Sequence, residues 1–121
     1  MYDIINYVKI NAGLSCLEED GVVFCSKPGT SIIVNFTEDP PGIFISVTGV
    51  SKKEADEILE KFRDYVKEEN KIIVNDEIQM QKKYADFDIY DISLDIEYKT
   101  DIGVDPDLII KLIQEIENII T

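Results

Sequence analysis

An unbroken alternation of apolar and polar side chains constrains the fold of this chain more than any other feature. From residue 90 to residue 98 every second residue is apolar, and the residues between them are Asp, Ser, Asp and Glu. Successive side chains of a strand point to opposite faces, so this segment is predicted to be a strand with one buried and one wetter face. Such a strand needs partner strands and a covering layer, so the chain must build a sheet.

Shorter β-rich runs in the first half supply candidate partner strands. We expect strands over 14–19, 22–26, 31–37 and 43–48, and a further β region that begins at Ile72. The dipeptide Asp20-Gly21 joins the first two runs and is a strong hairpin signal, because a type I′ turn needs positive φ at both central residues. Consecutive strands joined by tight turns pair antiparallel.

Helical spacing appears in three segments, namely 2–11, 51–69 and 105–120. Ser51 and Glu54 form a capping box at the start of the second segment. Asp105 suits the N-cap of the last one, and Pro106 suits its first position. The apolar arc of this last helix is broader than one sheet face requires, so it is either core or an interface. We therefore predict one α+β domain over 1–121, with helices packed on an antiparallel sheet in the order α-β-β-β(-β)-α-β-β-α.

The charge of the chain limits its partners. Its 121 residues carry a formal net charge of −13, with an estimated pI of 4.2. This charge repels phosphate backbones and anionic lipids, so we expect neither nucleic-acid nor membrane binding. The charge does not exclude basic partners or partners that bury apolar surface. No apolar run reaches the roughly 18 residues of a membrane span, and no signal-peptide pattern is present, so a cytoplasmic location is expected.

Residues that usually carry enzymatic chemistry are scarce. The chain has no His, which removes the commonest general base and metal ligand. No glycine pattern fits a phosphate-binding loop, and Arg63, the only arginine, is interpreted as a surface charge. We expect no enzyme and no cofactor, and we assign no catalytic, cofactor-binding or metal residue. A hydrolase that uses carboxylates alone is a lesser alternative.

Two groups of carboxylates deserve separate consideration. Asp101, Asp105 and Asp107 cluster around Gly103, and hard cations favour such oxygen ligands. The spacing does not fit an EF-hand, and acidic residues also stabilise a helix N-terminus, which is the interpretation we prefer. A second group, on the strand of residues 90–98, is interpreted as a solvated sheet face; it consists of Asp91, Asp95 and Glu97.

Cys16 and Cys25 flank the Asp20-Gly21 turn symmetrically. With a two-residue loop they face each other at a non-hydrogen-bonded pair, where side chains are closest and a disulfide can form. In a reducing cytoplasm we favour two free buried thiols, and a disulfide between them is the alternative. Neither cysteine lies in a pattern that indicates redox catalysis.

Three stretches resemble a known fold. Leu17–Phe24 resembles a first strand entry, Ile43–Ser51 resembles a third strand that meets a capped helix, and Asp91–Asp107 resembles a last strand, glycine turn and final helix. Together with the element order, they resemble the type III secretion chaperone fold, which also occurs in a family of bacterial sensory-transduction regulators. The resemblance implies a dimer without enzymatic activity. It supplies no client-binding residues.

We expect a non-enzymatic protein-interaction module with a chaperone- or adaptor-like role, which can form a homodimer. Two features motivate this expectation: the broad apolar arc of the last helix, and an acidic surface without catalytic residues. The alternative is a small-ligand or cation-binding regulatory domain that uses the carboxylates at 101–107 or 91–97.

Overall fold

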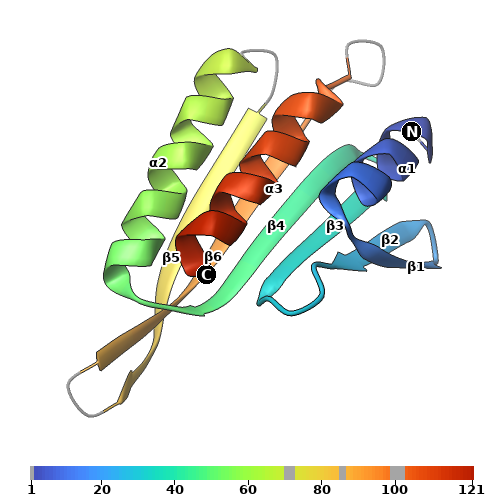
Figure 1. Ribbon diagram of the computed structural model, residues 1–121. Helices are drawn as coiled ribbons and strands as arrows, with labels where there is room; N and C mark the ends of the chain where they lie inside the picture. The colour runs from blue at the N-terminus through green and yellow to red at the C-terminus, as the bar shows by residue number, and fades with distance from the viewer. Residues whose placement is uncertain (1, 70–72, 85–86, 99–102) are drawn as a thin grey trace.

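The structure is a computed structural model that describes residues 2–69, 73–84, 87–98 and 103–121. Three helices and six strands lie in these ranges (Figure 1). In chain order they are α1 (Tyr2–Ala12), β1 (Ser15–Glu19), β2 (Val22–Ser26), β3 (Ile32–Glu38), β4 (Pro41–Val50), α2 (Lys52–Glu68), β5 (Ile73–Tyr84), β6 (Phe87–Glu97) and α3 (Pro106–Ile120). The predicted α+β class is confirmed, and the optional fourth strand before α2 is present.

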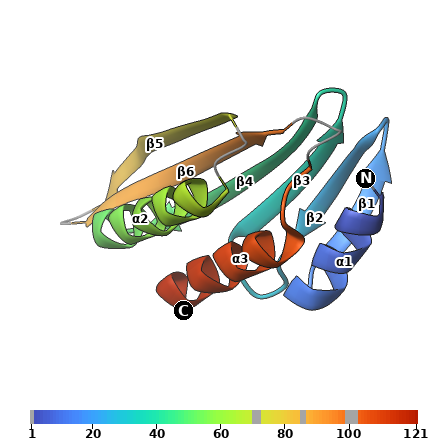
Figure 2. The same cartoon turned by 90° about the horizontal axis from the view of Figure 1, so that it is seen from above.

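All six strands form one antiparallel sheet in the order β1-β2-β3-β4-β6-β5. The first four follow one another as a meander. The chain then crosses through α2 to the far edge, and β6 returns between β5 and β4. Seen from above, the three helices lie on the same side of the sheet (Figure 2). The architecture of the described residues therefore has two layers, and none of their helices lies on the other face of the sheet.

The predicted hairpin between β1 and β2 is confirmed. Asp20 and Gly21 both have positive φ, 51° and 78°, as a type I′ turn requires. The register pairs Glu19 with Val22 and continues in step to Cys16 and Cys25. Because side chains alternate along each strand, this register decides which residues face the helices.

The core lies between the sheet and the helices. Ser51 caps α2 through the predicted capping box, and Asp105 caps α3 by accepting from the Asp107 amide. α3 contacts both α1 and α2, so it is covered on two flanks as well as by the sheet. Its broad apolar arc is therefore core, with Ile109, Ile110, Leu112, Ile113 and Ile116 buried. The interface interpretation of this arc is not supported, because the neighbouring helices and the sheet fill the space around it.

The β5–β6 hairpin differs from its predicted extent. β6 begins at Phe87, three residues before the predicted strand, and β5 runs to Tyr84. The register shifts between Met80 and Lys82, which interrupts the alternation there and hides the strand from a pattern search. The far end of this hairpin extends beyond the helices (Figure 1). The predicted strand start at Ile72 lies outside the described residues.

Candidate functional site: the open face of the sheet

The sheet face without helices has an ordered arrangement of side chains, and we call it the open face. Cross-strand register aligns its residues in three rows that run across the strands. The central row is mainly apolar: Leu17, Phe24, Asn35, Phe44 and Asp95. A row of hydroxyls lies on one side: Ser15, Ser26, Ile33, Ser46 and Ser93. The third row has a carboxylate on β1 and another on β6, and β5 continues it beyond β6: Glu19, Val22, Thr37, Gly42 and Glu97.

Large apolar side chains on this face are exposed to solvent. Leu17 is 67% exposed, and Phe24, Ile33 and Phe44 are 43%, 42% and 36% exposed. By contrast, the residues between them along the strands, such as Val34 and Ile45, are fully buried under the helices. The wetter face of an antiparallel sheet is ordinarily polar, so four neighbouring apolar side chains depart from that pattern. Clustered exposed apolar surface of this kind marks interaction sites in soluble proteins.

Two shallow hollows adjoin each other on the open face, and Asn35 lines both. One has a volume of about 480 Å³ and is lined by Leu17, Phe24 and Ile33, with Ser15, Ser26 and the Cys16–Cys25 pair. The other has a volume of about 370 Å³, and Phe44, Asp95 and Glu97 are among its lining residues. The open face is therefore hollowed rather than flat. Its apolar half lies towards β1, and its acidic half lies towards β6.

Asn35 is the polar centre of this face. Its cross-strand neighbours are Phe24 on β2 and Phe44 on β4. The Oδ1 atom of Asn35 is buried and has no hydrogen-bond partner among the described residues. An unpaired buried acceptor ordinarily costs about 1–3 kcal/mol of stability.

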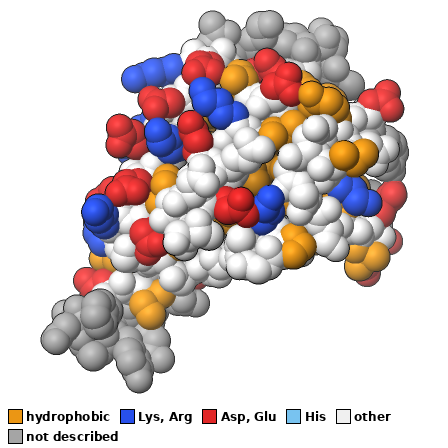
Figure 3. Space-filling view, in the orientation of Figure 1, with side chains coloured by type: hydrophobic (Ala, Val, Ile, Leu, Met, Phe, Trp, Pro, Cys, Tyr) orange, Lys and Arg blue, Asp and Glu red, His pale blue; other side chains and the backbone are white. Residues whose placement is uncertain are grey.

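Charge is distributed unequally between the two layers. None of the twelve basic residues lies in β1 to β4 or in β6, whereas five of them lie in α2. Charged side chains of both signs gather over α2 on the helical face (Figure 3). The same five strands hold seven carboxylates: Glu18, Glu19, Glu38, Asp88, Asp91, Asp95 and Glu97. Of these seven, alternation along the strands places Glu19, Asp91, Asp95 and Glu97 on the open face, and these five strands place no Lys or Arg there.

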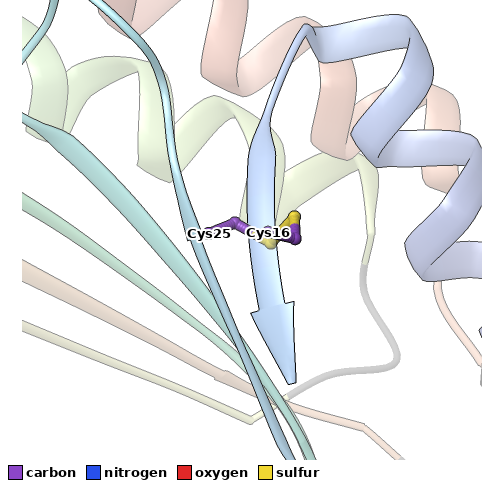
Figure 4. The surroundings of a disulfide bond; sticks show 2 residues. All are labelled: Cys16 and Cys25. Carbon is purple, nitrogen blue, oxygen red and sulfur yellow. A yellow bond between two sulfur atoms is a disulfide. The ribbon is translucent and has the colours of Figure 1, made fainter. Parts of the chain in front are cut away.

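A disulfide joins β1 to β2 directly beneath the apolar half of the open face (Figure 4). Cys16 and Cys25 are bonded, and their Cα atoms are 4.1 Å apart, the short spacing of a non-hydrogen-bonded pair. The predicted facing is confirmed, but the favoured state of two free thiols is wrong for this structure. The register alone brings the two sulfurs within bonding range. The bond ties the edge strand β1 in place and so keeps Leu17 beside Phe24.

The carboxylates near α3 have structural partners. Asp105 Oδ1 accepts from the Asp107 amide at 2.9 Å, and Asp107 Oδ1 accepts from the Tyr7 hydroxyl at 2.7 Å. This hydrogen bond is the main cause that raises the pKa of Tyr7. Asp101 lies outside the described residues. Both described carboxylates therefore serve the N-terminus of α3, in agreement with the preferred interpretation.

Three carboxylates of β6, those of Asp91, Asp95 and Glu97, lie on the side of the strand that belongs to the open face. Asp91 Oδ1 accepts from the Gly49 amide at 3.1 Å, which ties β6 to the end of β4. Asp95 and Glu97 lie in adjacent rows of the open face, as the predicted sheet-face interpretation requires. Across the described part of the chain, no three acidic or cysteine side chains come close enough together to hold a metal ion.

Away from the open face, a depression of about 390 Å³ lies between α2 and α3. Its rim alternates in charge, with Lys61, Lys67 and Lys111 set against Asp64, Glu68 and Glu115. Tyr65 lines it, and the Tyr65 hydroxyl is buried without a hydrogen-bond partner in the described ranges. Burial, and then the nearby Glu69 carboxylate, raise the pKa of this tyrosine well above its usual value. Arg63 is exposed on the same helix, as predicted.

The residues that distinguish the open face were missed by pattern reasoning. The alternation of β3 and β4 predicted their buried residues, but it assigned no role to Ile33 and Phe44, which lie between the core positions. The sequence did contain a signal. In β3 and β4 an apolar residue also occupies a position between the alternating residues that face the core. That pattern indicates a strand with apolar side chains on both faces.

Comparisons with known proteins leave the chain without an assigned family: no protein-family model, no curated protein and no solved structure matches it. The resemblance to secretion chaperones stays a prediction. Within residues 2–69, 73–84, 87–98 and 103–121, no helix is both long and apolar enough to cross a membrane.

Proposed function

We propose that this chain is a non-enzymatic protein-interaction module, with an adaptor- or chaperone-like role, that binds its partner through the open face. The observation that carries the proposal is the exposure of Leu17, Phe24, Ile33 and Phe44 on a sheet face that none of the described helices covers. The cytoplasm is the proposed location, although the Cys16–Cys25 bond is of a kind that persists mainly in oxidising compartments.

Several features support an interaction surface over a structural accident. The four apolar side chains come from four adjacent strands, β1 to β4, so they form one patch rather than isolated exposures. The disulfide holds the outermost of these strands in register. Asn35, whose Oδ1 is buried without a hydrogen-bond partner among the described residues, lies inside the patch between Phe24 and Phe44.

The cation-binding alternative has weaker support. Asp105 and Asp107 already accept hydrogen bonds from within the fold, and Asp91 accepts one from Gly49. A cation would have to compete with these bonds. The homodimer stays part of the proposal, but the α3 arc that suggested it lies in the core.

The test is affinity capture from extract of the native host with three baits. The first bait is the wild-type protein, and the second carries Phe24→Thr and Phe44→Thr, which remove apolar surface and introduce β-branched residues that suit a strand. The third bait carries Ile10→Thr, which removes the most exposed large apolar side chain of α1, at 76% exposure. Circular dichroism and thermal melting verify that all three baits are folded.

The proposal predicts that wild-type and Ile10→Thr baits retain the same protein and that the open-face double variant loses it. Retention of that protein by all three folded baits would place the contact elsewhere and contradict the proposal. Loss with the Ile10→Thr bait alone would contradict it as well, because α1 would then be the binding element.

A further inference from the structure

We infer that the partner docks a basic surface on the open face: an apolar centre with Lys or Arg side chains at its two ends. The inference rests on the proposed function and adds the chemistry of the partner. It is drawn from three features of the open face, namely its charge, the placement of its carboxylates and the position of Asn35.

The charge of the face selects the sign of the partner. On β1 to β4 and β6 the open face carries Glu19, Asp91, Asp95 and Glu97 and no Lys or Arg. The whole chain has a net charge of −13, so its long-range field is negative as well. A partner with basic side chains would be steered to this face and held by it, whereas an acidic partner would be repelled.

The placement of the carboxylates gives the partner a geometry. Glu19 on β1 and Glu97 on β6 lie in the same cross-strand row, Asp95 lies in the apolar row beside it, and β5 continues both rows beyond β6. Adjacent strands are about 4.8 Å apart, so four strand steps separate Glu19 from Glu97 by roughly 19 Å. Phe24 on β2 and Phe44 on β4 lie between these two strands, and Leu17 lies beside Glu19 along β1. The matching surface therefore has apolar side chains across its middle and cations roughly 19 Å apart.

Asn35 adds a third requirement. Its cross-strand neighbours are Phe24 and Phe44, and it lines both hollows, so the centre of the open face is not apolar throughout. A partner that places one polar side chain among its apolar side chains matches this arrangement.

A second copy of this chain fits the open face poorly. Face-to-face docking of two copies would bring a second Glu19, Asp95 and Glu97 against the first set, and each copy carries a net charge of −13. Like charges in apposition suppress association. The complementarity therefore favours a different protein with basic side chains.

The inference can be tested with three short peptides of equal length that alternate Val with Lys, with Thr or with Glu. Their binding is measured by isothermal titration calorimetry at low and near-physiological salt. Four proteins are compared: wild type, the Phe24→Thr/Phe44→Thr variant, an Asp95→Asn/Glu97→Gln variant, and a control with Glu60→Gln/Asp64→Asn. The control removes the same net charge from exposed positions of α2.

We expect the Lys peptide to bind tightest and the Glu peptide weakest, with the difference reduced by salt. Neutralising Asp95 and Glu97 should weaken the Lys peptide about tenfold at low salt, and the α2 control should leave it unchanged. Equal weakening by the α2 control would show diffuse attraction to the acidic protein and would overturn the inference.

Two other results separate this inference from the proposed function. If the three peptides bind equally and all depend on Phe24 and Phe44, the open face is an interaction site, but its preference for basic partners is refuted. If no peptide binds wild-type protein at millimolar concentration, the basic docking surface is likewise refuted. In that case the capture experiment with open-face variants still decides the proposed function on its own.

Discussion

Asn35 lies directly opposite Phe44 in the register of β3 and β4, on the sheet face that the three helices leave uncovered. The pair combines the two properties that set this face apart. Phe44 exposes apolar surface to solvent, and the Oδ1 of Asn35 is buried without a donor in the described part of the chain. The buried acceptor reduces the stability of the isolated protein, and a partner that covers the face would remove the apolar surface of Phe44 from water.

Replacement of Asn35 by Val should stabilise the isolated protein. The substitution removes the unpaired acceptor and adds a β-branched side chain to a strand, which together should be worth about 1 kcal/mol in the free energy of unfolding. Thermal melting should show a rise of about 4 °C.

Ser46→Val is the matched control for this prediction, since Ser46 lies on the same face of the neighbouring strand. It adds the same side chain without removing an unpaired acceptor, so it should raise the melting temperature less than Asn35→Val. An Asn35→Val protein that is less stable than wild type would show that Asn35 is satisfied in the free protein, contrary to this account.

The layered fold was predictable because its signals are local. The alternation of β6 and the capping box at Ser51 each depend on a few neighbouring residues, as does the Asp20-Gly21 turn. The register of β1 and β2 follows from that turn by counting, and it predicted that Cys16 faces Cys25.

The candidate site was not predictable in the same way. The strand order decides whether Ile33 and Phe44 lie beside each other, and whether a helix covers them depends on the side of the sheet on which α1, α2 and α3 pack. Both are non-local properties. The breadth of the α3 arc was misleading for the same reason, since its extra apolar residues pack against α1 and α2.

Loss of the Cys16–Cys25 bond should destabilise the hairpin. The bond closes a short loop, with a sequence separation of 9, and a loop of this size contributes about 2–3 kcal/mol by the chain-entropy relation. The double variant Cys16→Ala/Cys25→Ala should therefore unfold at lower urea concentration than the oxidised wild-type protein. Reduced wild-type protein should behave like the double variant.

Thiol labelling tests the bonded state itself. Denatured but unreduced protein should incorporate no maleimide, and denatured, reduced protein should label at both cysteines, the only two in the chain. Full labelling before reduction would contradict the bond.

Tyr65 should make the protein sensitive to alkaline pH. Burial and the Glu69 carboxylate raise the pKa of its hydroxyl above the ordinary value of 10.0. A raised pKa in the folded state means that stability is complete below pH 10 and falls as the pH rises above it, because the unfolded chain ionises first. Urea unfolding at successive pH values should show this loss.

Tyr65→Phe should reduce the alkaline loss and should also stabilise the protein at neutral pH by about 1 kcal/mol, because it removes a buried hydroxyl without a partner. Tyr7→Phe serves as the comparison. It removes the hydrogen bond to Asp107 and should therefore lower stability at neutral pH. Unchanged alkaline sensitivity in Tyr65→Phe would assign the effect to other tyrosines, such as Tyr98, whose pKa is also raised by burial.

The open face should not mediate self-association. Wild-type protein and the Phe24→Thr/Phe44→Thr variant should have the same solution mass by sedimentation equilibrium, whether that mass is one chain or two, because the carboxylates of two copies would meet on this face. A dimer of wild-type protein that the variant cannot form would contradict the acidic-face argument. It would identify a second copy as the occupant.

Covalent footprinting of the captured complex tests the central claim most directly. Side chains of the free protein and of the complex are labelled with a carbene reagent and quantified by mass spectrometry. The account predicts that labelling of Leu17, Phe24 and Phe44 falls in the complex and that labelling of Ile10 on α1 does not change. Protection of Ile10 with unchanged labelling of the three open-face residues would show that the partner binds the helical layer, and it would contradict the account.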